Sequence, residues 1–277
     1  MKKTFVMKMA VSLIAMSISA LPVFAADIDA FRGEKGEIKI SGGTAHIPVM
    51  KEAAQRIMSK NPGIQISIAG GGSGVGIKQV GEGLVNIGNS GRKPTDSEIS
   101  RYSLKMYQWA VDGVAPVVNP RNKVKQLSKA QLAEIFAGKV NNWKQLGGVD
   151  RKINLYTRDE ASGTREVFWE QGLSKGRIAP SANVVISNGA MKSAVSQDPY
   201  AIGYVSVGHI DRTVAAVTLD GVTPTIRTVQ DGSYPIARGL YSNTKGAPAG
   251  LTRKFIDYLY TPSGKAIIKK HGFIPVR

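Results

Sequence analysis

The order of segments along the chain most constrains its fold: a short apolar strand ends in a polar, glycine-bearing loop, and a helix follows. Three loops of this kind carry serine or threonine beside glycine: Ser-Gly-Gly-Thr at 41–44, Gly-Gly-Gly-Ser-Gly at 70–74 and Ser-Gly-Thr at 162–164. A fourth, at 89–92 (Asn-Ser-Gly-Arg), follows another short strand. Alternating strands and helices are typical of α/β folds, whose ligands bind beyond the carboxyl ends of strands. We therefore expect an α/β protein in which these loops converge on one small ligand.

Local capping and stop signals mark several helices. Pro48 predicts a helix start, and Asn-Pro-Gly at 61–63 predicts its end. Ser128 with Gln131 forms a capping box, and Asn188 is expected to cap a later helix. Two further helices are expected over 251–259 and after Thr261-Pro262.

The loop at 157–165, Thr-Arg-Asp-Glu-Ala-Ser-Gly-Thr-Arg, carries the strongest chemical signal. Ser162 and Thr164 are suited to cap a helix, and Gly163 lets the backbone approach a ligand closely. Arg158 can present a planar fork of donors to a tetrahedral oxyanion. Unpaired amides at a helix start favour an anion as well. The loop predicts an anion site, and the alternative is a surface helix cap beside a solvated arginine.

The first 25 residues have the three parts of a secretory signal peptide. Early lysines precede an apolar run over 9–20, and the small-residue pattern Val23-Phe24-Ala25 follows. This pattern predicts cleavage after Ala25. The apolar run is too short to be a membrane-spanning helix. The chain has no cysteine, which excludes disulfides and a lipid anchor on cysteine. These features predict an exported protein of the bacterial periplasm.

Several classes of protein do not fit the sequence. The formal net charge of +17 is dispersed, without a basic run or basic-aromatic strip, so we expect anion steering and no nucleic-acid partner. The glycine run lacks the endings of a P-loop and of a dinucleotide-binding loop. His46, His209 and His271 lack metal-ligand spacing and are expected to be ordinary surface or packing residues. We expect no metal and no cofactor.

Several specific motifs occur along the chain: Arg-Asp-Glu-Ala-Ser-Gly-Thr-Arg at 158–165, Gly-Gly-Gly-Ser-Gly-Val-Gly-Ile at 70–77, the segment 127–143, Ala-Ile-Gly-Tyr at 201–204, Tyr234-Pro235, Arg238 with Leu240-Tyr241, and Gly-Phe-Ile-Pro at 272–275. In combination they resemble the periplasmic phosphate-binding proteins of bacterial phosphate ABC transporters. The similarity spans nearly the whole chain after the leader.

The resemblance implies an α/β fold of the two-lobed type II periplasmic binding protein class. Each lobe would be a mixed sheet flanked by helices, and two crossover strands at the hinge would lie near 111–118 and 237–241. After the signal peptide at 1–25, lobe 1 would comprise 26–112 and 236–277, and lobe 2 would comprise 113–235.

By the same resemblance, the protein would capture inorganic phosphate in the cleft between its lobes, without catalysis. It would be a monomer that delivers phosphate to the membrane permease subunits of an ABC importer. Glu160 matches an acidic position that holds the arginine of the family in place. The implied phosphate ligands are Thr44, Ser73, Gly74, Ser90, Arg158, Ser162, Gly163 and Thr164.

The match departs from the family at the position after Ser90. Well-known members have an aspartate there that can accept the proton of hydrogen phosphate, whereas this chain has Gly91. Arg92 is either a second cation in the cleft or a solvated surface residue. Two alternatives therefore stay open: a binding protein for another oxyanion (sulfate, molybdate or a phosphonate), and a secreted phosphatase or surface adhesin.

Overall fold

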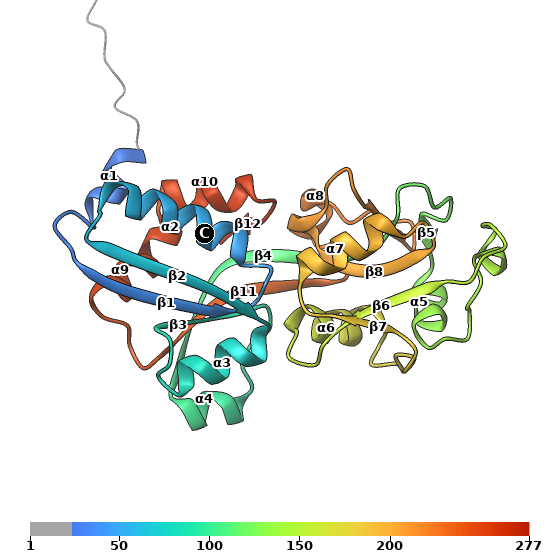
Figure 1. The fold of residues 1–277 in the computed structure, drawn as a ribbon, viewed down its shortest axis with the longest axis horizontal. Coiled ribbons are helices and arrows are strands. Elements are labelled where there is room, and N and C mark those ends of the chain that lie inside the picture. Colours follow the sequence, from blue (N-terminus) through green and yellow to red (C-terminus); the bar gives the residue numbers. More distant parts are fainter. Residues whose placement is uncertain (1–23, 277) are drawn as a thin grey trace, which may run out of the picture.

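The computed structural model describes residues 24–276, which form two lobes joined by two long strands (Figure 1). The predicted signal peptide lies outside the described residues except for its last two, which begin helix α1 (Phe24–Asp29). No helix among the described residues is long and apolar enough to span a bilayer.

The first lobe is built on a mixed sheet. Its strands lie in the order β2 (Ile64–Gly71), β1 (Gly36–Gly42), β3 (Ile87–Ser90), β11 (Ala237–Lys245) and β4 (Leu104–Val118). The first three are parallel, so their carboxyl ends share one edge. The helices of this lobe are α2 (Ile47–Lys60), α3 (Ser73–Gly81), α4 (Asp96–Tyr102), α9 (Gly250–Tyr260) and α10 (Pro262–Lys270).

The second lobe continues the same sheet with β8 (Ala201–Ser206), β6 (Asn154–Arg158) and β7 (Asn183–Val185), of which β6 is parallel to both neighbours. Its helices are α5 (Lys129–Phe136), α6 (Gly163–Val167), α7 (Asn188–Gln197) and α8 (Ile226–Gln230). Short elements complete the chain: β5 (Gln126–Leu127), β9 (Ala215–Ala216), β10 (Thr218–Leu219), β12 (Ile274–Pro275), 3₁₀ turns at Trp143–Leu146 and Val207–His209, and a π-helical turn at Phe168–Gly172.

The strands β4 and β11 are the two connections at the hinge, as the family resemblance implied. They pair antiparallel up to Ala237 opposite Gly113, and from Val114 onward β4 pairs with β8 instead. One strand therefore belongs to both lobes, and Figure 1 shows β4 and β11 running side by side between them. This arrangement leaves the edge with the carboxyl ends of β1 and β3 facing that of β6.

Each lobe has its own apolar core. Trp109 is buried in the first, where the apolar face of α2 packs in one cluster with residues of β1 and β2. Trp143 is buried in the second, where Phe168 and Tyr204 stack with ring centroids 4.1 Å apart. Separate cores let each lobe move as a unit, because burial within a lobe does not depend on contacts with the other.

Capping signals were predicted correctly with one exception. The Ser128 capping box with Gln131 is present at α5, and Pro48 lies in the first turn of α2. At α7 the cap is Ser187, whose Oγ accepts from the amide of Ala190, so the expectation for Asn188 was wrong. The Asn188 side chain turns to other partners, described below.

Candidate anion-binding site

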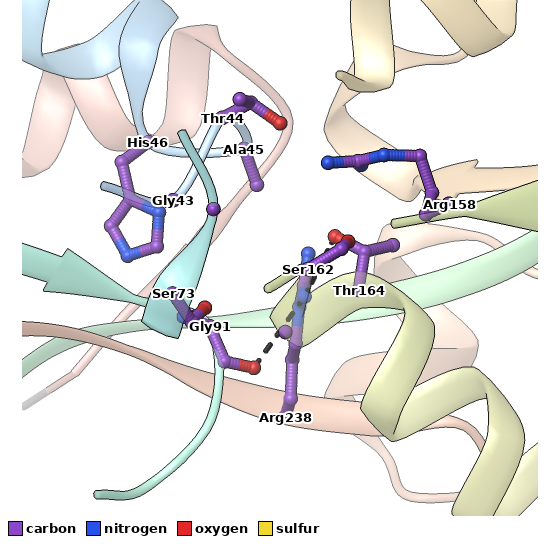
Figure 2. Close-up of a pocket in the computed structure, with 12 residues that line it drawn as sticks. Gly43, Thr44, Ala45, His46, Ser73, Gly91, Arg158, Ser162, Thr164 and Arg238 are labelled. Carbon is purple, nitrogen blue, oxygen red and sulfur yellow. Dashed lines mark hydrogen bonds between the residues drawn. The ribbon is translucent and has the colours of Figure 1, made fainter. Parts of the chain in front are cut away.

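A cavity lies where loops from both lobes meet (Figure 2). It is small, with about 180 Å³ of space between its lining atoms, part of which is open to solvent. Its size therefore suits a small ion. The lining residues are Gly43, Thr44, Ala45, His46, Gly72, Ser73 and Gly91 from the first lobe, Arg158, Ser162, Gly163 and Thr164 from the second, and Arg238 from β11.

Arg158 is the last residue of β6, and its guanidinium extends toward Thr44 and Ala45 of the opposite lobe (Figure 2). Nε donates to the carbonyl of Val185 and Nη2 to that of Ile186, each at 3.0 Å, which fixes the plane of the group. Nη1 is buried and has no hydrogen-bond partner among the described residues. Burial lowers the pKa of Arg158, and an anion beside Nη1 would offset that cost.

Two serine hydroxyls line the cavity from opposite lobes. Ser162 caps α6, and its Oγ accepts from the amide of Arg165 at 3.2 Å. Ser73 is the first residue of α3, and its Oγ accepts from the amide of Gly91 at 2.9 Å. A Cβ at Gly163 would collide with the Ser73 hydroxyl, so this close approach requires glycine. Because an amide can only donate, each hydroxyl keeps its own proton available for another acceptor.

The two threonines of the cavity are held in the same way. Oγ1 of Thr44 accepts from the amide of Asn188 at 3.2 Å and from its Nδ2 at 3.1 Å, which links the lobes. Oγ1 of Thr164 accepts from Nη1 of Arg238 at 3.0 Å. All four hydroxyls of the cavity are therefore oriented as donors, and no carboxylate lines it within the described part of the chain. Such a lining complements an anion whose oxygens accept.

Arg238 lines the cavity and was not among the predicted site residues. Its Nε and Nη2 donate to Oδ2 of Asp112, and both side chains are almost completely buried. Each residue is the lone charge of a short, otherwise apolar segment, at 236–240 and 109–114. A lone charge in an apolar segment is the sequence signal of a buried, paired side chain, although it does not identify the partner.

His46 also lines the cavity, a position that its sequence context did not predict. Its ring is fully buried, edge-on to Trp109, with Nε2 3.2 Å from the carbonyl oxygen of Ser90. Burial, and to a smaller extent the charge of Arg238, lower the pKa of His46 to about 3. The ring is therefore neutral at physiological pH and adds no charge to the cavity. It is a packing histidine, as expected, although one that lies beside the site.

The structure brings six of the eight predicted ligands to the cavity: Thr44, Ser73, Arg158, Ser162, Gly163 and Thr164. Two others lie outside the lining. The amide of Gly74 donates to the carbonyl of Ala161 at 3.0 Å, and Oγ of Ser90, completely buried, accepts from Nδ2 of Asn243.

Glu160, which the family resemblance assigns to holding the arginine, forms no ion pair with Arg158 among the described residues. Glu160 is exposed, and the carboxylate that contacts Arg158 is that of Asp159, with Oδ2 3.7 Å from Nη2. Nε and Nη2 of Arg158 donate to main-chain carbonyls, and these two hydrogen bonds orient the side chain without Glu160.

Arg92 is neither a cation in the cavity nor a solvated surface residue. Its side chain is 13 % exposed and forms ion pairs with Glu98 and Glu166, each at 2.7–2.8 Å. Two carboxylates therefore neutralise this arginine just outside the lining.

Comparisons with known proteins agree with this geometry. A model of the PBP superfamily domain matches residues 30–263. The chain is 41 % identical over 254 residues to the phosphate-binding protein PstS of Bacillus subtilis, which covers 90 % of this chain and 84 % of that protein. A two-lobed fold with a small polar cavity between the lobes defines a solute-binding protein. The chain belongs to the PBP superfamily and, within it, to the PstS family of phosphate-binding proteins.

Solved structures show the same fold. One is assigned as a phosphate ABC transporter substrate-binding protein of Clostridium perfringens and contains phosphate. It is 33 % identical, with a TM-score of 0.82 over 87 % of this chain and 100 % of its own. A phosphate transport receptor of Vibrio cholerae is also 33 % identical, with a TM-score of 0.70 over 86 % of this chain and 99 % of its own.

Proposed function

We propose that this protein captures inorganic phosphate in the cavity between its lobes. The observation that carries the proposal is the buried, unpartnered Nη1 of Arg158 in a cavity whose four hydroxyls all have a proton left to donate. A tetrahedral oxyanion satisfies these donors together. The relatives named as phosphate-binding proteins, one of them solved with phosphate, support phosphate as that anion.

The donors are sufficient for tight binding. Hydrogen bonds to charged groups contribute roughly 1.5–3 kcal/mol each. A micromolar dissociation constant needs only about −8 kcal/mol, so several such bonds suffice after desolvation and lobe closure are subtracted. Two arginines and a positive net charge also raise the rate at which an anion reaches the cavity.

The wider role extends this proposal. The protein would be exported, cleaved after Ala25, and act as a periplasmic monomer that hands phosphate to the permease of an ABC importer without catalysis. The leader-like sequence and the transporter relatives support this role. We also propose that the lobes divide as 26–112 with 236–277 and as 113–235. The change of partner of β4 at Gly113 supports these bounds.

A second candidate ligand is another oxyanion, such as sulfate. The absence of a carboxylate from the described lining favours it, because no charged acceptor is present to repel an anion that carries no proton.

Calorimetric titration of the anion-stripped mature protein with phosphate tests the proposal. We expect a dissociation constant of about 1 μM or lower, and no binding by the Arg158→Ala variant. If the wild-type protein binds neither phosphate nor sulfate, the proposed function is wrong.

A further inference from the structure

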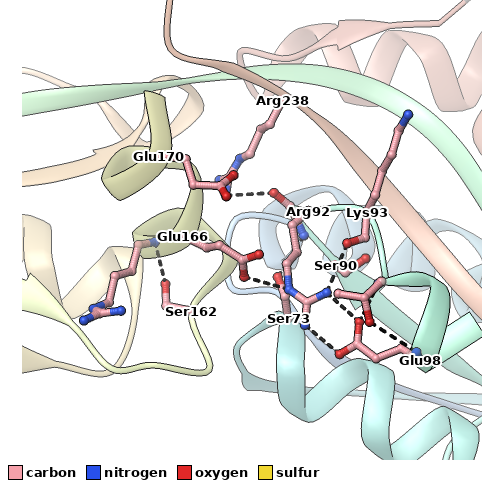
Figure 3. A network of polar contacts seen from close by, with 12 residues as sticks. Ser73, Ser90, Arg92, Lys93, Glu98, Ser162, Glu166, Glu170 and Arg238 are labelled. Carbon is pink, nitrogen blue, oxygen red and sulfur yellow. Dashed lines mark hydrogen bonds and ion pairs between the residues drawn. The ribbon is translucent and has the colours of Figure 1, made fainter. Parts of the chain in front are cut away.

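Arg92 connects the two lobes outside the cavity (Figure 3). Its Nε lies 2.8 Å from Oε2 of Glu166, which belongs to α6 of the second lobe. Its Nη1 and Nη2 each lie 2.7 Å from one oxygen of Glu98, which belongs to α4 of the first lobe. One guanidinium therefore bridges carboxylates from opposite sides of the cleft.

The two halves of this bridge differ in what they require. Glu98 is fixed within its own lobe, because it forms a capping box with Thr95 at the start of α4 and holds Arg92 through two parallel hydrogen bonds. This half can persist when the lobes separate. The contact between Arg92 and Glu166 spans the cleft, so it exists only when the lobes are closed.

The bridge also adjoins the cavity. Gly91, the residue before Arg92, lines the cavity, and so do Ser162, Gly163 and Thr164 at the start of the helix that carries Glu166. Closing the lobes on an anion therefore brings the two ends of the bridge together. The Arg92 side chain is only 13 % exposed and that of Glu166 is 39 % exposed, so water screens this pair less than a fully exposed one.

We propose that Arg92, positioned by Glu98, is a latch that closes on Glu166 and slows release of the bound anion. Arg92 would act on affinity through the closed conformation and not by touching the ligand. The proposal rests on the function proposed above, since it assigns the latch to the phosphate cavity. It gives the chain an affinity-determining contact that lies outside the ligand-binding residues.

The variant Glu166→Gln tests the latch without disturbing the Arg92–Glu98 pair. We expect the dissociation constant for phosphate to rise about two- to fivefold, which is the size of effect that a partly exposed ion pair has. The change should appear in the dissociation rate constant. If the Glu166 charge acted only through its electrostatic field, the affinity would change in the opposite direction, because removing a negative charge near the cavity strengthens anion binding. The direction of the effect therefore separates the two explanations.

Glu170→Gln is the matched control. Glu170 lies one turn further along the same segment, loses the same charge, and pairs with Lys175 of its own lobe at 3.0 Å. We expect it to bind phosphate as tightly as the wild-type protein or more tightly. Glu166→Gln binding that equals the control, with both variants folded by circular dichroism, would overturn the latch.

Small-angle scattering of the anion-free proteins tests the latch independently of phosphate. Glu166→Gln should have a larger radius of gyration than wild type, because the closed form loses a contact, whereas Glu170→Gln should not. A wild-type protein that fails to bind phosphate would refute the proposed function while leaving this comparison intact. Equal radii for the three proteins would count against the latch.

Discussion

Arg238 and Asp112 lie directly opposite each other on β11 and β4, and two guanidinium nitrogens donate to one carboxylate oxygen at 3.0 and 2.8 Å. The same carboxylate accepts from the Ser206 hydroxyl through its other oxygen, and the same arginine donates to Thr164 at the cavity. The pair therefore connects the hinge strands to the site. Its burial makes it a stability determinant as well as part of the cavity wall.

Removing one partner of this pair should destabilise the protein strongly. Asp112→Ala leaves Arg238 buried without its counter-ion, which typically costs about 3–5 kcal/mol. We expect that loss in the free energy of unfolding measured by urea denaturation. The exposed pair between Asp257 and Arg253 on α9 is the control, and Asp257→Ala should have a small effect. Similar losses in both variants would contradict the role given to burial.

Arg158→Ala should abolish phosphate binding while the fold survives. It removes the buried Nη1 and its charge, and the lost charge-assisted bonds correspond to a fall in affinity of at least about 100-fold. Arg165→Ala removes the same charge from the same loop at a residue that does not line the cavity, and should change affinity little. Calorimetry measures both, and wild-type affinity in Arg158→Ala would refute the site assignment.

Sulfate should compete with phosphate for this cavity. The lining consists of donors without a carboxylate among the described residues, so sulfate meets no fixed negative charge and phosphate gains no charged acceptor for its proton. We expect the two affinities to lie within about 100-fold of each other, since one unmatched polar contact costs roughly 1–3 kcal/mol. Titration of the phosphate complex with sulfate checks this, and no displacement at a thousandfold excess would contradict it.

Stability should fall as the pH is lowered below about 6.5. Burial lowers the pKa of His46 to about 3 and that of His209 to about 4, whereas both take up a proton in the unfolded chain near pH 6.5. The unfolded state therefore binds more protons between these values, and stability present above pH 6.5 is progressively lost below it.

For each histidine this loss amounts to about 1.4 kcal/mol between pH 7.5 and pH 5.5. Urea denaturation at the two values, in phosphate-free buffer, measures it. The His46→Gln variant should show a smaller difference between the two pH values than the wild-type protein. An unchanged pH dependence in that variant would show that His46 is not responsible.

The sequence alone determined the features that depend on neighbours along the chain. The Ser128 capping box, the helix start at Pro48 and the strand-loop-helix order follow from local backbone preferences, and all three are present. The convergence of the loops that carry Ser73 and Ser162 could also be predicted, because each loop follows the carboxyl end of a strand, where the ligands of α/β folds bind.

Only the tertiary structure decided which side chains reach the cavity and what holds them. Arg238 and Asp112 are 126 residues apart, and Asn188 reaches Thr44 across 144 residues and the cleft. Arg92 was ambiguous in the sequence because its partner Glu166 belongs to the other lobe. Hydrogen bonds and ion pairs act over a few ångströms in space, so chain separation carries no information about them until the two lobes are folded and brought together.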